Sequence, residues 1–102
     1  MEQVTISKSM HRVLSSLTGE HRADIAVELA TKDLLRLKVK EVEERIREFE
    51  TRYQMKFAEF KQAWNADKIP SRRSYEVERD YWEWEAAVGN VDKLRQMVDE
   101  LL

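Results

Sequence analysis

The chain contains no cysteine, one proline and two glycines among its 102 residues. The absence of cysteine excludes disulfides, thiolate zinc sites and cysteine nucleophiles. With only Gly19 and Gly89, the sequence has no glycine-rich loop of the kind that binds phosphate. Neither His11 nor His21 has an acidic residue three positions before it, as a di-metal site in a helical bundle requires. We therefore expect no catalytic site, no metal and no cofactor.

Long apolar runs are also absent. No stretch approaches the roughly 18 to 20 apolar residues that span a bilayer. The first residues lack the basic region and following apolar region of a secretory signal. We expect a cytoplasmic protein with no membrane partner.

Charged residues make up 37% of the chain, and the mean hydropathy is −0.68. A chain of this length then has little apolar material for a core of its own, which favours oligomerisation. Abundant Glu, Lys, Arg, Leu and Ala are typical of long helices. We expect a mainly α protein that forms a homodimer or homotetramer.

The charge is unevenly distributed. Residues 1–40 carry seven Lys or Arg against five acidic residues, a net charge of +2, while residues 41–102 carry eleven against fifteen, a net charge of −4. A weakly basic first part and an acidic remainder are suited to different partners, although +2 is a weak signal for nucleic acid.

An apolar seam with alternating spacings of four and three lies near the middle of the chain. This spacing is typical of a helix that packs on another helix, as in a coiled coil. The seam belongs to a predicted helix over residues 23–53, roughly 45 Å long at about 1.5 Å per residue. Before Leu35 the apolar arc is wider, so we expect the first half to be buried in a small core and the rest to extend as an arm. We assign the oligomer seam to Leu35, Val39, Val42, Ile46, Phe49 and Tyr53.

Residues 3–7 alternate polar and β-branched side chains, a pattern that predicts a short strand. A lone strand must pair with another, and pairing across a two-fold axis is the simplest solution. The alternative is a disordered N-terminus. Ser9 is suited to cap a short helix over residues 10–17, which Gly19 then ends.

The second half contains two predicted interruptions. We expect a bend over residues 54–56 and a linker that contains the only proline. Ser74 is suited to cap a last helix, in which Gly89 predicts a kink or a break. Antiparallel packing of this helix on the arm fits the spacing equally well within one chain or between chains.

These patterns divide the chain into four parts: a dimerising strand-helix-helix head over 1–38, a helical arm over 39–66 that is continuous with the head, a linker over 67–74 and an acidic aromatic helix over 75–102. The order of elements in the head resembles the ribbon-helix-helix fold of small prokaryotic repressors and antitoxins. That resemblance implies a strand pair that enters the major groove of operator DNA. Gln3, Thr5 and Ser7 would then contact the bases.

The segment Arg52-Tyr53-Gln54-Met55-Lys56-Phe57-Ala58-Glu59-Phe60, with the acidic aromatic stretch after it, is similar to small prokaryotic proteins of the antitoxin type. Their common form has glycine where Gln54 stands, a difference that suggests a straighter helix here. The resemblance implies a toxin–antitoxin pair, in which the N-terminal part dimerises and the C-terminal part covers a toxin that is often an RNase.

Residues 75–85 combine four aromatic and five acidic residues. Exposed aromatic side chains framed by carboxylates suit a partner with a basic cleft. We expect an antitoxin-like protein that neutralises a small basic toxin by steric occlusion and regulates itself through DNA if DNA binding is retained. The alternative is a self-assembling helical scaffold in which the same helix closes its own bundle. The predicted partner-binding residues are Tyr81, Trp82, Glu83, Trp84 and Glu85.

Overall fold

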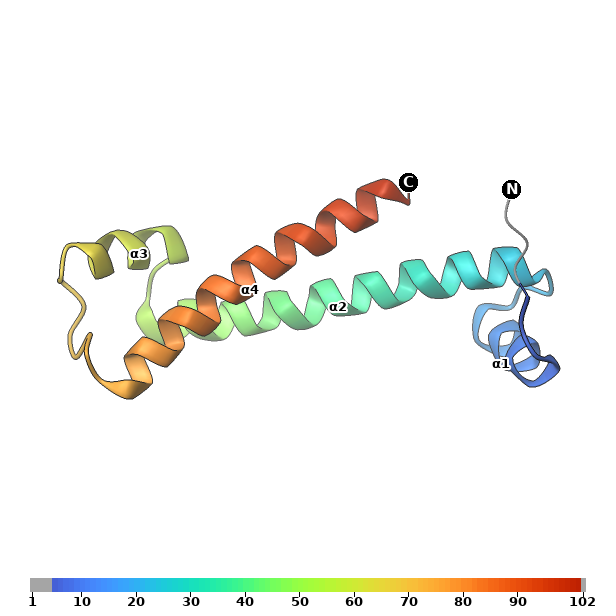
Figure 1. The fold of residues 1–102 in the computed structure, drawn as a ribbon, viewed down its shortest axis with the longest axis horizontal. Helices are drawn as coiled ribbons and strands as arrows, with labels where there is room; N and C mark the ends of the chain where they lie inside the picture. The colour runs from blue at the N-terminus through green and yellow to red at the C-terminus, as the bar shows by residue number, and fades with distance from the viewer. Residues whose placement is uncertain (1–4, 102) are drawn as a thin grey trace.

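The structure is a computed structural model in which residues 5–101 are described, and this part of the chain contains four helices and no strand (Figure 1). The long helices α2 and α4 form an antiparallel hairpin, α1 lies against the first turns of α2, and α3 lies against α4. The prediction of a mainly α protein is confirmed. The helices are α1 (Lys8–Thr18), α2 (Ala23–Tyr53), α3 (Phe57–Asn65) and α4 (Tyr75–Glu100).

The molecule is a rod that measures 57 × 23 × 18 Å along its principal axes. Its Cα radius of gyration is 19.6 Å, whereas a compact domain of this length would have a value of about 13 Å. Because α2 extends along most of the rod, α1 and α3 lie at opposite ends (Figure 1).

The predicted N-terminal strand is wrong where the structure describes it, and Gln3 lies outside the described residues. Ser7 has an extended backbone, but its Oγ accepts a hydrogen bond from the backbone N–H of Met10 at 3.1 Å. Ser7 therefore caps α1, which begins at Lys8, and Ser9 lies inside the helix. The free N–H groups of a first helical turn need an acceptor, and this local requirement outweighs a five-residue alternation. The ribbon-helix-helix head is not supported.

Other helix ends lie where the sequence predicts them. Gly19 adopts the left-handed conformation (φ 73°) and ends α1, as predicted. Ser74 caps α4 through a hydrogen bond from the N–H of Val77 to its Oγ at 3.3 Å. The predicted helix over residues 23–53 is confirmed at both ends.

The predicted bend after α2 is confirmed. Gln54 adopts the left-handed conformation (φ 56°) and ends α2, and its side-chain Nε2 donates a hydrogen bond to the carbonyl oxygen of Thr51 at 2.6 Å. Glutamine thus performs the turn that glycine usually performs. The expectation that glutamine would straighten the helix here is wrong.

The hydrophobic core lies at the end of the rod where α2, α3 and α4 meet, which we call the aromatic end. Trp84 is fully buried at its centre, with its ring centroid 5.0 Å from that of Phe60 and 5.5 Å from that of Phe49. Such aromatic pairs contribute about 0.5–1.5 kcal/mol each beyond their burial. The buried core residues are Phe49, Phe60, Ile69, Tyr81 and Trp84.

The predicted oligomer seam packs within the chain. Phe49 and Tyr53 both stack on Trp84 of α4, with ring centroids 5.5 and 5.8 Å away. Further along the hairpin, Val39 and Val98 line the same hollow between α2 and α4. The arm that we expected to extend from a core is therefore the part of α2 that α4 covers. The remaining seam residues are partly buried: Leu35, Val42 and Ile46.

The opposite end of the rod, which we call the open end, consists of α1, α2 from Ala23 to Leu37, α4 from Met97 to Glu100, and Leu101 after it. Ala26 is its only buried residue among those described. The expected burial of the first half of α2 is thus wrong, because α4 ends beside Lys32 and Leu35 and the short α1 covers only the first turns. Eight large apolar side chains are exposed there: Met10, Val13, Leu17, Leu29, Leu34, Leu37, Met97 and Leu101.

Candidate functional site

The structure separates the five predicted partner-binding residues. Tyr81 and Trp84 are buried in the chain's own core, so they are not available to a partner. Trp82 is 60% exposed. Glu83 forms an ion pair with Arg45 of α2, and Glu85 lies 4.0 Å from Lys61 of α3. The helix therefore uses one side for its own core and leaves the other side free.

Trp82 belongs to an exposed surface on the outer side of α4, which we call the α4 aromatic surface. Tyr75, two turns earlier, is 75% exposed, and the guanidinium of Arg79 lies 5.5 Å from the centre of the Tyr75 ring. Acidic side chains of the same helix surround these rings, and aromatic anchors with a charged rim are typical of protein interfaces. The exposed acidic residues are Glu76, Glu78 and Glu83.

Sequence reasoning missed a buried polar cluster between α4 and α2. Asp80 is only 3% exposed, and its Oδ2 accepts hydrogen bonds from the Tyr53 hydroxyl at 2.6 Å and from Arg52 at 2.7 Å. Although burial opposes ionisation, these two hydrogen bonds hold the pKa of Asp80 below its ordinary value. Burial and the Asp80 carboxylate raise the pKa of Tyr53 to about 12. At neutral pH the cluster is therefore a carboxylate held by a protonated hydroxyl and a guanidinium.

A second stripe on α2 was also missed, on a different face of the helix from the seam. Its residues recur at spacings of three and four, so they lie along one face of the helix. We call it the outer face of α2. It is apolar in its first part and acidic in its second, and Leu34 and Leu37 are 55% and 51% exposed. Its members are Ala23, Ala26, Ala30, Leu34, Leu37, Glu41, Glu44 and Glu48.

The sequence held the signal for this stripe, since the spacing is as regular as that of the seam. The wide apolar arc before Leu35 includes the apolar members of this stripe, which are Ala23, Ala26, Ala30 and Leu34. We interpreted the arc as a single buried face. Which part of this face is buried and which is exposed depends on where α4 ends, and helical periodicity does not specify that position.

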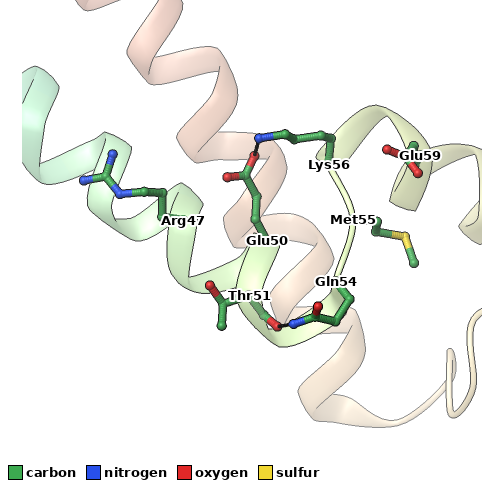
Figure 2. Close-up of a pocket in the computed structure, with 7 residues that line it drawn as sticks. All are labelled: Arg47, Glu50, Thr51, Gln54, Met55, Lys56 and Glu59. Carbon is green, nitrogen blue, oxygen red and sulfur yellow. Dashed lines mark hydrogen bonds and ion pairs between the residues drawn. The ribbon is translucent and has the colours of Figure 1, made fainter.

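A hollow of about 500 Å³ lies at the bend between α2 and α3, and Figure 2 shows the residues that line it. The ammonium of Lys56 pairs with Glu50 at 3.1 Å across it, and Gln54 donates to the carbonyl of Thr51. These contacts satisfy polar groups within the bend, and we assign no ligand to the hollow. Its lining is Arg47, Glu50, Thr51, Gln54, Met55, Lys56 and Glu59.

The predicted DNA-binding residues do not form a reading surface in the described chain. Thr5 is exposed beside α1 without strand geometry, and the Ser7 hydroxyl serves as the helix cap. Gln3 lies outside the described residues. The arrangement that would have carried base contacts, a strand pair, is not present in residues 5–101.

Residues 5–101 contain no cluster of three or more His, Cys, Asp or Glu placed to hold a metal ion. Over the same residues, each helix is too short or too polar to cross a membrane.

Comparison with known proteins gives one family match, which extends over residues 1–102 and carries the description uncharacterized protein MJ0235 family. No curated protein and no solved structure matches the chain. Because the match covers the whole sequence, the chain belongs to the uncharacterized protein MJ0235 family.

Proposed function

We propose that the protein is a helical interaction protein that acts by binding a second copy of itself through the open end, and not by catalysing a reaction. The placement of apolar side chains supports this proposal. All the large, fully buried side chains lie at the aromatic end, whereas eight large apolar side chains are exposed at the open end. Gathered exposed apolar residues mark interaction surfaces more often than scattered ones do.

The energetic gain from covering this end is large enough for a stable dimer. Complete burial of a leucine side chain stabilises by about 1.5–3 kcal/mol. Leu34 and Leu37 are each about half exposed, so covering both in two copies contributes roughly 3 to 6 kcal/mol before the entropic cost of association. The other exposed side chains of the open end add to that total.

Sedimentation equilibrium tests the proposal. At tens of micromolar we expect the wild-type chain to sediment with twice its mass of 12.2 kDa. The double substitution Leu34→Asp with Leu37→Asp places charges in the interface and should give the single-chain mass, with helicity by circular dichroism unchanged because both side chains are exposed in the monomer.

Trp82→Asp is the matched control, since it also replaces an exposed apolar side chain but at the aromatic end. It should leave the dimer intact. A wild-type chain that stays monomeric at 100 micromolar would refute the proposal.

The α4 aromatic surface supports a second candidate, antitoxin-like occlusion of a small basic protein such as an RNase. Trp82 and Tyr75 are exposed with acidic neighbours, as an interface for a basic cleft requires. This surface is separate from the open end, so a dimer leaves it accessible.

The second candidate is tested with the product of any neighbouring open reading frame that encodes a short basic protein. We expect the wild-type chain to inhibit the purified product's ribonuclease activity. Trp82→Ala should weaken inhibition by tenfold or more, as expected for an aromatic anchor worth about 2 kcal/mol. Met97→Ala, at the other end of α4, should change nothing. Equal inhibition by both variants would exclude the α4 aromatic surface.

A further inference from the structure

The outer face of α2 changes character along its length. From Ala23 to Leu37 it is apolar, and from Glu41 to Glu48 its members are all exposed carboxylates. Glu41 and Glu48 pair with Lys38 at 3.6 Å and Arg45 at 2.7 Å on the same helix. Such exposed pairs are weak and exchange readily with other cations. The face is therefore half apolar and half available to a basic partner.

A basic element lies at the apolar end of the same face. Ala26 is fully buried at a level of α2 where α1 is the neighbouring helix, so α1 lies over this part of the face. Between Lys8 and Thr18, α1 carries Lys8, His11 and Arg12 but no acidic residue. One half of the face is thus covered by a basic helix, and the other half is acidic and uncovered.

These charges decide the orientation of a second copy on this face. In a parallel pair, the two acidic halves would face each other and the two basic helices would lie at one end, which is repulsive. In an antiparallel pair with Leu34 opposite Leu37 of the second copy, Glu41, Glu44 and Glu48 fall opposite Ala30, Val27 and Ala23 of that copy. Those are the turns over which the second copy's α1 lies.

We infer that two copies bind as an antiparallel two-fold dimer, with Leu34 and Leu37 of both chains at its centre and α1 of each copy against Glu41, Glu44 and Glu48 of the other. The inference rests on the proposed self-association and specifies its geometry. Under two-fold symmetry each copy supplies one basic helix and one acidic stripe, so both contacts form within the dimer and no third copy is added. Standard interfaces bury about 800 Å² per partner, and the dimer covers both the leucines and the acidic stripe.

Charge-reversal substitutions in α1 and α2 test this geometry in the full-length chain. Arg12→Glu and Glu44→Lys should each raise the dissociation constant at least about fivefold in sedimentation equilibrium, because each occurs twice in a two-fold dimer. The two together in one chain should restore the constant to within about twofold of wild type. Glu59→Lys, exposed on α3, is the control for net charge and should have no effect.

Restoration identifies a contact between copies, because the two positions are far apart within one chain. Glu44 lies 18 residues beyond Ala26 on α2, or roughly 27 Å along the helix axis. If the single substitutions weaken the dimer and the pair does not restore it, the antiparallel geometry is wrong while self-association stands. If Glu44→Lys leaves the dimer unchanged, the acidic stripe serves a different basic partner and the geometry is again wrong. A wild-type monomer would refute both proposals.

Discussion

At the residue scale, Asp80 is the most demanding side chain in the molecule. A buried carboxylate is costly unless hydrogen bonds and a nearby cation compensate for lost water. Here Tyr53 and Arg52 supply both to Oδ2, while Oδ1 has no hydrogen-bond partner in the described chain. The cluster joins the last turn of α2 to the second turn of α4. It therefore fixes how the hairpin closes at the aromatic end.

Removing the charge should destabilise the hairpin. Asp80→Asn leaves the Arg52 guanidinium without its carboxylate partner and weakens the hydrogen bond from Tyr53. We expect a loss of about 1–3 kcal/mol in the free energy of unfolding, measured by urea denaturation. Asp99→Asn, on an exposed turn of the same helix, should change it by less than about 0.5 kcal/mol.

The pH dependence follows from the same cluster. The pKa of Asp80 in the folded chain is below its ordinary value of 3.8, so folding favours the ionised form. The stabilisation is complete above about pH 4 and is lost as the pH falls through the lower, folded pKa. Between the ordinary pKa and the folded-state pKa of Asp80, the free energy of unfolding of the wild type should therefore fall more steeply with decreasing pH than that of Asp80→Asn. Parallel curves would show that the carboxylate is not stabilised by its partners.

At the scale of the element, α4 runs without interruption from Tyr75 to Glu100, although Gly89 predicts a kink or a break. A glycine inside a helix costs about 1 kcal/mol relative to alanine, and the packing of Val88 against the core and the burial of Val91 offset that cost. A Cβ added at Gly89 would have no atom within 4 Å. The glycine is thus not required by any contact within the described chain.

Gly89→Ala should raise the free energy of unfolding by about 0.5–1 kcal/mol, because alanine restricts the unfolded chain and fits the helix. Thermal denaturation by circular dichroism should show an increase in the midpoint of about 2–8 °C. Gly19→Ala is a control with the opposite expected sign. Gly19 has a φ of 73°, at which a Cβ is strained, so this substitution should lower the free energy of unfolding. A destabilising Gly89→Ala would indicate close approach of another chain at α4.

Sequence reasoning succeeded for elements whose ends carry their own signals. Gly19, Ser74 and the turn at Gln54 act through the local backbone, so short-range patterns were sufficient. The strand over residues 3–7 failed because five alternating residues compete with a serine that caps a helix. Among the predicted partner-binding residues, Trp82 is exposed, whereas Trp84 is buried in the core. Trp84 shares its helical face with Tyr81 and Val88, and that spacing was the signal for its burial.

At the scale of the whole molecule, the error concerned the location of the core. We expected a core in the head and an arm whose seam packs on a second copy. In the structure the core lies at the aromatic end, and the seam packs on α4 of the same chain. The apolar spacing of the two stripes on α2 is equally regular, but only the seam ends in large rings, Phe49 and Tyr53, that pack on Trp84. Ring area, and not periodicity, determines which stripe receives α4. Whether a second copy binds the outer face of α2 depends on the protein concentration, which the sequence does not determine.

The rod's geometry also links its two ends mechanically. The helix α4 meets α2 at both ends of the hairpin: Trp84 stacks on Phe49 near the aromatic end, and Val98 lines a small cavity together with Leu35 toward the open end. From Trp84 to Glu100 the helix extends roughly 24 Å, so a rotation of about 10° at the core moves its tip by roughly 4 Å, about three-quarters of the rise of one helical turn. A change of side-chain volume at Phe49 would therefore rotate α4 at the core and displace its far tip. It would alter the spacing of the far tips, and with it the fit of any bound chain, without touching a residue that the bound chain contacts.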